Sequence, residues 1–74
     1  MAAPRMTVAG ILKRVEDIRK RAAPPSLDDE SAHGHEDDLH KDVLRAIANG
    51  ASSPSLLARA ALETSKIKFP RHCG

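Results

Sequence analysis

Three histidines stand among carboxylates near the middle of the chain, and they are the residues best suited to metal chemistry. This stretch contains His33, His35 and His40 together with Asp28, Asp29, Glu36 and Asp37. Imidazole nitrogens and carboxylate oxygens could ligate zinc or nickel. However, His33 and His35 lie in a glycine-containing segment, His40 lies at a helix border, and no established zinc spacing is present. We therefore predict no metal site, and metal binding by this stretch is the open alternative.

Cys73 follows His72 near the end of the sequence, and a thiol beside an imidazole is a pairing used in nucleophilic catalysis. A nucleophile in a terminal dipeptide has no rigid scaffold to hold a base or an oxyanion hole. The sequence also contains no glycine-rich phosphate loop and no shielded pair of carboxylates. We therefore predict that the protein is not an enzyme and has no catalytic residue and no cofactor.

Length and composition favour one small helical domain over residues 1–74. A chain of 74 residues buries only about 60% of its unfolded surface. Phe69 is the one aromatic residue, so the core must come from Leu, Ile, Val and Ala, which suits helix packing. The lone cysteine favours a reducing compartment, and no apolar run reaches the roughly 18 residues of a membrane span. We expect an all-α, cytoplasmic protein without a membrane segment.

Apolar residues recur at helical spacing over residues 7–22, after a flexible N-terminus at 1–6. Thr7 is a suitable N-cap for this helix. Its apolar positions form a narrow stripe, here called the N-terminal seam: Val8, Ile11, Val15 and Ile18. Pro24 and Pro25 end the helix, and residues 23–34 show no clean period, so we expect a linker there.

Two further helices are predicted in the C-terminal half. The first covers residues 35–49 and ends at Asn49 and Gly50, which tolerate the left-handed conformation. The second covers residues 53–66, with Ser53 as its cap and Pro54 in its first turn. Because this last helix is apolar around most of its circumference, we expect it to be the most buried. The result is a small three-helix bundle, or a helix plus a helical hairpin, with an extended tail at 67–74.

The N-terminal seam is the predicted protein-binding surface. Two heptads are too few for a stable free coiled coil, so Val8, Ile11, Val15 and Ile18 must dock either on this chain's own core or on another protein. We predict a non-catalytic protein-interaction module with a protein partner, contacted through the seam or through the acidic linker. The sequence does not determine the oligomeric state.

Nucleic-acid binding is the alternative function. The helices at 35–49 and 53–66 are joined by a short turn, as in a DNA-binding helix-turn-helix. The candidate phosphate-binding residues are Arg59, Lys66, Lys68 and Arg71. Charge is segregated along the chain, at +4 over residues 1–26, −6 over 27–42 and +4 over 43–74. This pattern fits separate partner surfaces, or a fold that neutralises itself.

The C-terminal half also resembles small helical proteins of unknown function from phages and prophages of high-GC bacteria. The matching residues are Leu39, Val43, Leu44, Ala46, Ile47, Ala48, Gly50, Leu57, Ala58, Ala61, Leu62, Thr64, Ile67, Phe69 and Arg71. His72 departs from that family, which has an aromatic residue after the arginine. The resemblance implies no catalytic residue and a phage-type accessory protein that binds a host or viral protein.

Overall fold

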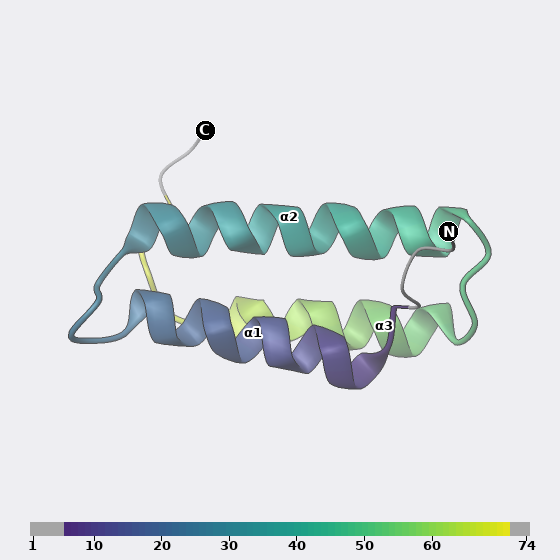
Figure 1. Cartoon of the computed structure of the whole chain (residues 1–74), viewed down its shortest axis with the longest axis horizontal. Helices are drawn as coiled ribbons and strands as arrows, with labels where there is room; N and C mark the ends of the chain where they lie inside the picture. The colour runs from purple at the N-terminus through teal and green to yellow at the C-terminus, as the bar shows by residue number, and fades with distance from the viewer. Residues whose placement is uncertain (1–5, 72–74) are drawn as a thin grey trace.

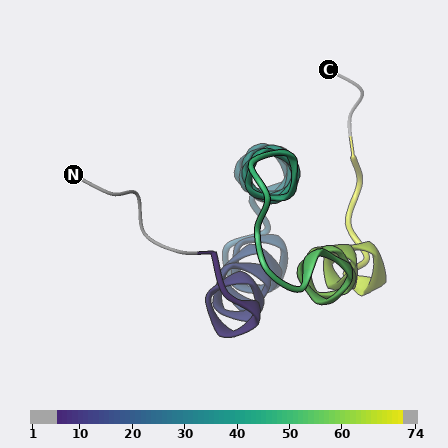
Figure 2. The same ribbon diagram turned by 90° about the vertical axis from the view of Figure 1, so that its right-hand side faces the viewer.

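The chain folds into three packed helices, as a computed structural model that describes residues 6–71 shows. Helices α1 (Val8–Ala22), α2 (Asp29–Ala48) and α3 (Pro54–Ala61) run in alternating directions, and a 3₁₀ segment, η1 (Leu62–Lys66), continues α3 (Figure 1). Seen end-on, the helices lie at the corners of a triangle, and each packs on the other two (Figure 2). The predicted all-α fold is confirmed, and the described residues contain no strand.

Helix α1 has the bounds that its sequence predicts. The Thr7 hydroxyl oxygen accepts a hydrogen bond from the backbone nitrogen of Gly10 at 3.0 Å, which satisfies one of the free N–H groups of the first turn. The helix ends at Ala22, two residues before the first of two prolines. Proline cannot donate the hydrogen bond that a further turn would need.

Helix α2 begins at Asp29, six residues before the predicted start at residue 35, so the predicted linker at 23–34 is wrong beyond residue 28. The Asp28 carboxylate caps the helix by accepting from the backbone nitrogen of Ser31 at 3.1 Å. Ala32 is fully buried. Gly34 costs an exposed helix about 1 kcal/mol, and the cap and the packing of this first turn offset that cost.

The predicted helix at 53–66 divides into α3 and η1, which together bury a larger share of their residues than α1 or α2, as predicted. Ser53 precedes α3 in the left-handed region, at φ 55°, and makes no side-chain capping bond. After Ala61 the chain tightens into the 3₁₀ geometry of η1. Two leucines of this stretch, Leu56 and Leu62, remain more than half exposed. The apolar residues of this stretch therefore cover more of the helix surface than the other helices can bury.

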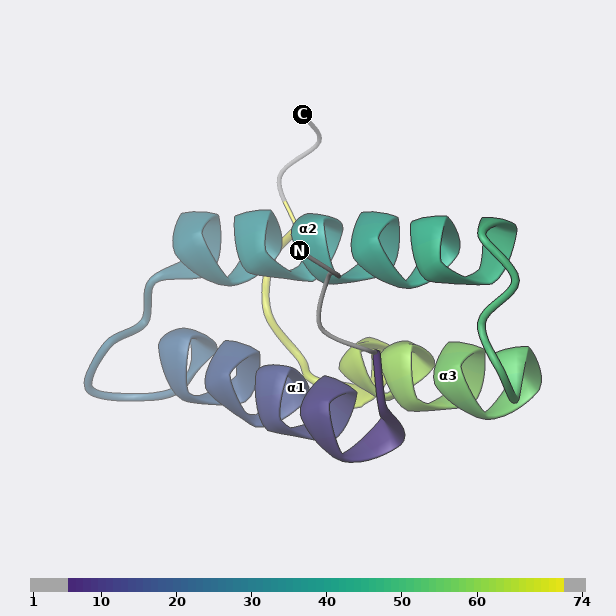
Figure 3. The same cartoon turned by 45° about the vertical axis from the view of Figure 1, so that its right-hand side comes forward.

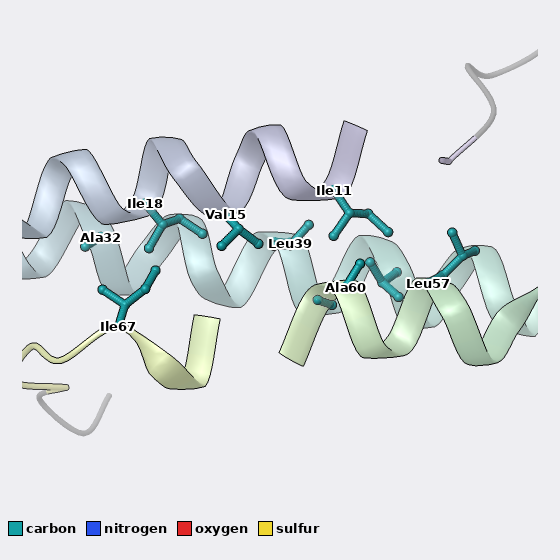
Figure 4. Packing of buried hydrophobic residues seen from close by; sticks show 10 residues of the cluster. Ile11, Val15, Ile18, Ala32, Leu39, Leu57, Ala60 and Ile67 are labelled. Atoms are coloured by element: carbon teal, nitrogen blue, oxygen red, sulfur yellow. The ribbon is translucent and has the colours of Figure 1, made fainter. Parts of the chain in front are cut away.

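Side chains from all three helices and the tail meet in one core (Figure 4). Its members are Ile11, Val15, Ile18, Ala32, Leu39, Val43, Leu57, Ala60, Ala61 and Ile67. Three of these ten are alanines, which let neighbouring helices approach closely. Ile67 is buried, so the tail at 67–71 is part of the packed structure.

The ends of the described region differ in part from the predicted flexible N-terminus and tail. Met6 is half-buried and packs against the core. The predictions for residues 1–5 and 72–74, including those for His72 and Cys73, lie outside the described residues. Between residues 6 and 71, no helix combines the length and apolar character that crossing a membrane requires.

Candidate protein-binding surface

The N-terminal seam lies inside the bundle and does not face a partner. Ile11 is fully buried, Val15 and Ile18 are buried, and Val8 is half-buried at the same face of α1. Figure 4 shows Ile11, Val15 and Ile18 directed from α1 toward the other helices. The seam therefore closes the chain's own core, and its buried side chains are not available to another protein while the bundle is intact.

The four predicted nucleic-acid-binding residues do not form one surface. Arg71 is held against Glu36 of α2, and the Lys66 ammonium pairs with Glu63 at 3.1 Å. Arg59 lines a groove between α1 and α3, whereas Lys66 and Lys68 together line a recess beside the end of α1. A DNA-reading helix needs its base-reading and phosphate-binding side chains on one exposed face. DNA binding by a helix-turn-helix therefore stays a prediction, because the structure does not place these four residues on one exposed face.

Arg71 and Glu36 form an ion pair, here called the clasp, that fixes the tail to α2. The tail rises from the end of η1 past α2 (Figure 3). Arg71 Nε donates to Glu36 Oε1 at 2.8 Å and Nη2 donates to Oε2 at 3.0 Å, so the pair is bidentate. Nη2 also donates to the carbonyl oxygens of Thr64 and Ile67, at 2.9 and 3.1 Å. This geometry gives strong, directional hydrogen bonds to a carboxylate that is almost fully buried.

A second polar contact ties η1 to α2 beside the clasp. His40 Nε2 lies 3.0 Å from the Thr64 hydroxyl oxygen, and this hydroxyl donates to the carbonyl oxygen of Ala61 at 3.2 Å. His40 Nε2 also lies 3.4 Å from the Ala61 carbonyl oxygen, so a hydrogen on Nε2 would serve both contacts. Thr64 is fully buried, so these bonds satisfy a polar group inside the bundle.

The clasp keeps Glu36 ionised. Burial alone would raise the pKa of Glu36, but the hydrogen bonds and charge of Arg71 outweigh burial, and its pKa lies below its ordinary value. A carboxylate with a lowered pKa in the folded state stabilises that state most above the pKa of unfolded glutamate, about 4.3. This contribution is lost as the pH falls through the lower, folded-state pKa.

We expect Arg71→Ala to lower the free energy of unfolding by about 1 to 3 kcal/mol near pH 7, because it leaves a buried carboxylate without its donor. The difference from the parent chain should shrink at a pH well below the pKa of unfolded glutamate, because the contribution of Glu36 is lost as the pH falls through its lowered folded-state pKa. Urea unfolding at the two pH values measures this, with Lys68→Ala as the matched control for an exposed cation in the same tail. An equal difference at both pH values would show that Arg71 acts only through packing.

The histidine-rich stretch does not converge on one point. His40 bonds to Thr64, His33 Nε2 lies 3.6 Å from a carboxylate oxygen of Asp37, and His35 is exposed. Among residues 6–71, no three side chains of the metal-ligating types come together. Helix α2 explains the separation, because His33 and His40 share a face but lie two turns apart, about 10 Å along the axis, whereas His35 lies on another face.

An apolar groove lies between α2 and α3 on the face that α1 leaves uncovered, and we call it the α2–α3 groove. It has a volume of about 280 Å³ and is lined by His40, Val43, Leu44, Ile47, Ala58, Ala61 and Leu62. Leu44 and Leu62 are 64% and 61% exposed, the former on α2 and the latter at the start of η1. His40 is the one polar residue that lines the α2–α3 groove. Its contact with Thr64 places the His40 ring between the groove and the clasp.

A second open groove, the α1–α3 groove, lies between the other pair of helices. It is lined by Val8, Leu12, Leu56, Arg59, Ala60 and Glu63. Leu12 and Leu56 are 44% and 52% exposed. The two grooves therefore lie on either side of α3 and hold four of the five large apolar side chains that are exposed within residues 6–71.

Sequence reasoning did not single out the leucines of either groove or the clasp. Leu44 lies at the edge of the apolar face of α2, a position that could have marked it as half-exposed. Glu36 falls at helical spacing between Ala32 and Leu39, so an acid within an apolar row was the available signal for a buried ion pair. Comparison with protein-family models, with curated proteins and with solved structures finds no match for this chain.

Proposed function

We propose that the protein is a non-catalytic interaction module whose α2–α3 groove binds an amphipathic helix with acidic flanks from a partner protein. The observation that carries this proposal is the exposure of Leu44 and Leu62 at one apolar groove. Neither leucine is needed to close the core, which the buried residues already fill. The proposal keeps the predicted class of function and moves the contact surface from the N-terminal seam to this groove.

The groove offers an apolar surface of the kind that binds one face of a helix. Helix-in-groove recognition places side chains at positions i, i+3, i+4 and i+7 of the partner into an apolar channel. Fully burying one leucine side chain contributes about 1.5 to 3 kcal/mol. Because Leu44 and Leu62 are already partly covered, burying their exposed parts supplies only a share of the free energy that a micromolar complex requires, about 8 kcal/mol, and other contacts must supply the rest.

The charge around the groove selects the partner. Beside the lining residues of the groove in the sequence stand Lys41, Asp42, Arg45, Arg59 and Glu63, and of these Arg59 lines the α1–α3 groove. The two acids are already paired, Asp42 with Arg14 of α1 and Glu63 with Lys66. Lys41 takes part in none of the ion pairs found within residues 6–71. This cation favours carboxylates beside the apolar face of the partner helix.

A designed peptide pair tests this proposal. Both peptides carry leucines at i, i+3, i+4 and i+7, one with glutamates and the other with lysines on the flanks, and fluorescence anisotropy measures binding to the full chain. We expect the acidic peptide to bind at least roughly tenfold more tightly. Leu44→Glu and Leu62→Glu should each weaken its binding by a similar factor, because they place a like charge in the groove.

The matched controls are Leu12→Glu and Leu56→Glu, which place the same charge in the α1–α3 groove and should leave binding of the acidic peptide unchanged. Equal loss of affinity in all four variants, or equal affinity for the two peptides, would refute the proposed groove. Titration of duplex DNA under the same conditions tests the nucleic-acid alternative, whose affinity should fall steeply with salt.

A further inference from the structure

We propose that the α1–α3 groove binds a second copy of this chain and forms a two-fold symmetric dimer. The α1–α3 groove lies across α3 from the α2–α3 groove, so this surface is separate from the proposed partner site. The inference does not depend on what the α2–α3 groove binds. It rests on the arrangement of apolar and charged residues at the α1–α3 groove.

The apolar part of this surface comes from two helices. Leu12 on α1 and Leu56 on α3 are both about half exposed and line the same open groove, with half-buried Val8 and buried Ala60 beside them. Small residues in the floor of a groove leave room for a side chain from outside. In a two-fold dimer, each copy offers both the protruding leucines and the groove that receives them.

The charged part of the surface complements itself. Arg59 and Glu63 line the same groove and are four residues apart, which is about one helical turn. A two-fold axis that crosses α3 between them places Arg59 of each copy opposite Glu63 of the other. Two ion pairs then form across the interface.

The ion pairs within one copy leave Arg59 and Glu63 available for the contact between copies. Arg59 is exposed and takes part in none of the ion pairs found between residues 6 and 71. Glu63 pairs with Lys66, whose side chain is 71% exposed, and a carboxylate has lone pairs for a further donor. An acidic helix would meet Glu63 with like charge here, whereas a second copy brings an arginine to it. Charge complementarity therefore favours a second copy.

Sedimentation velocity of the full chain over a concentration series tests the dimer. We expect the parent chain to shift from monomer toward dimer as its concentration rises, and Leu56→Glu to remain monomeric at every concentration. The matched control is Leu62→Glu, which changes a leucine of similar exposure in the other groove and should dimerise as the parent does. A thermal melt of each variant shows that it is folded, and Leu12→Glu replaces Leu56→Glu if that variant does not fold.

Exchanging the charges of Arg59 and Glu63 distinguishes this specific interface from nonspecific association. Arg59→Glu and Glu63→Arg should each weaken the dimer by roughly tenfold or more, because each places like charges opposite one another. The double variant that carries both changes restores opposite charges and should dimerise almost as the parent does. A parent chain that stays monomeric up to millimolar concentration, or a double variant as weak as the single ones, would overturn the proposal. A parent dimer that Leu62→Glu alone disrupts would place self-association at the α2–α3 groove and would equally overturn it.

Discussion

The Ile11→Asp substitution should abolish the cooperative thermal unfolding of the protein. Ile11 is fully buried where α1 meets the other helices, and no cation lies among the buried core residues that would pair with a carboxylate there. Burying an ionised group without a partner costs more than about 4 kcal/mol, which is comparable to the whole stability of a small domain. Circular dichroism during heating measures the loss as a broad, non-cooperative decline of helical signal.

The neighbouring Leu12→Asp substitution is the matched control, because it introduces the same charge one residue along α1 at a position that is 44% exposed. At low protein concentration, where the monomer prevails, its melt should stay close to that of the parent chain. A cooperative, parent-like melt for Ile11→Asp would mean that the N-terminal seam does not close the core and is free to serve a partner.

The Leu57→Ala substitution should lower the free energy of unfolding by about 2 to 4 kcal/mol. Leu57 is 2% exposed and belongs to the core that α3 shares with α1 and α2. Truncating it removes apolar contacts and leaves a cavity that the surrounding helices fill only in part. Urea unfolding, with the midpoint and slope fitted together, measures the change.

Ile47→Ala provides the comparison for Leu57→Ala. Ile47 is half-buried and lines the α2–α3 groove, so its truncation leaves an open surface where no closed cavity forms. We expect a smaller loss, on the order of 1 kcal/mol, for this variant. Equal losses at the two positions would indicate that the groove is closed in solution and that Ile47 belongs to the core.

The bundle could be predicted where local sequence and packing agree. For α1, the Thr7 cap, the spacing of the seam and the proline pair all point to the same bounds, and the structure has them. For α2, the local signals conflict. Gly34 opposes a helix, whereas the Asp28 cap and the burial of Ala32 favour one, and burial depends on contacts that a single sequence does not reveal.

The candidate surfaces were less predictable than the helices. A helix pattern shows which residues are apolar, but the number of neighbours decides how many of them are buried. Leu57 and Leu62 both belong to the apolar surface of the predicted helix at 53–66, yet one is buried and the other exposed, because five residues apart they lie on different faces and only one face meets the core. The clasp joins residues 35 positions apart, so no local pattern could place Arg71 on Glu36.

We expect the clasp also to determine when the fold can be completed during synthesis. Helices α1 and α2 can pair as soon as residues 8–48 have left the ribosome, but Glu36 then lies at their surface without a cation. The Glu36 carboxylate must stay hydrated until Arg71 emerges, because burying this charge without a partner costs free energy. We therefore expect the final step of folding, in which η1 docks and the tail crosses α2, to wait for residue 71. A nascent chain stalled just before that point should hold α1 and α2 as a looser pair that chaperones can still engage.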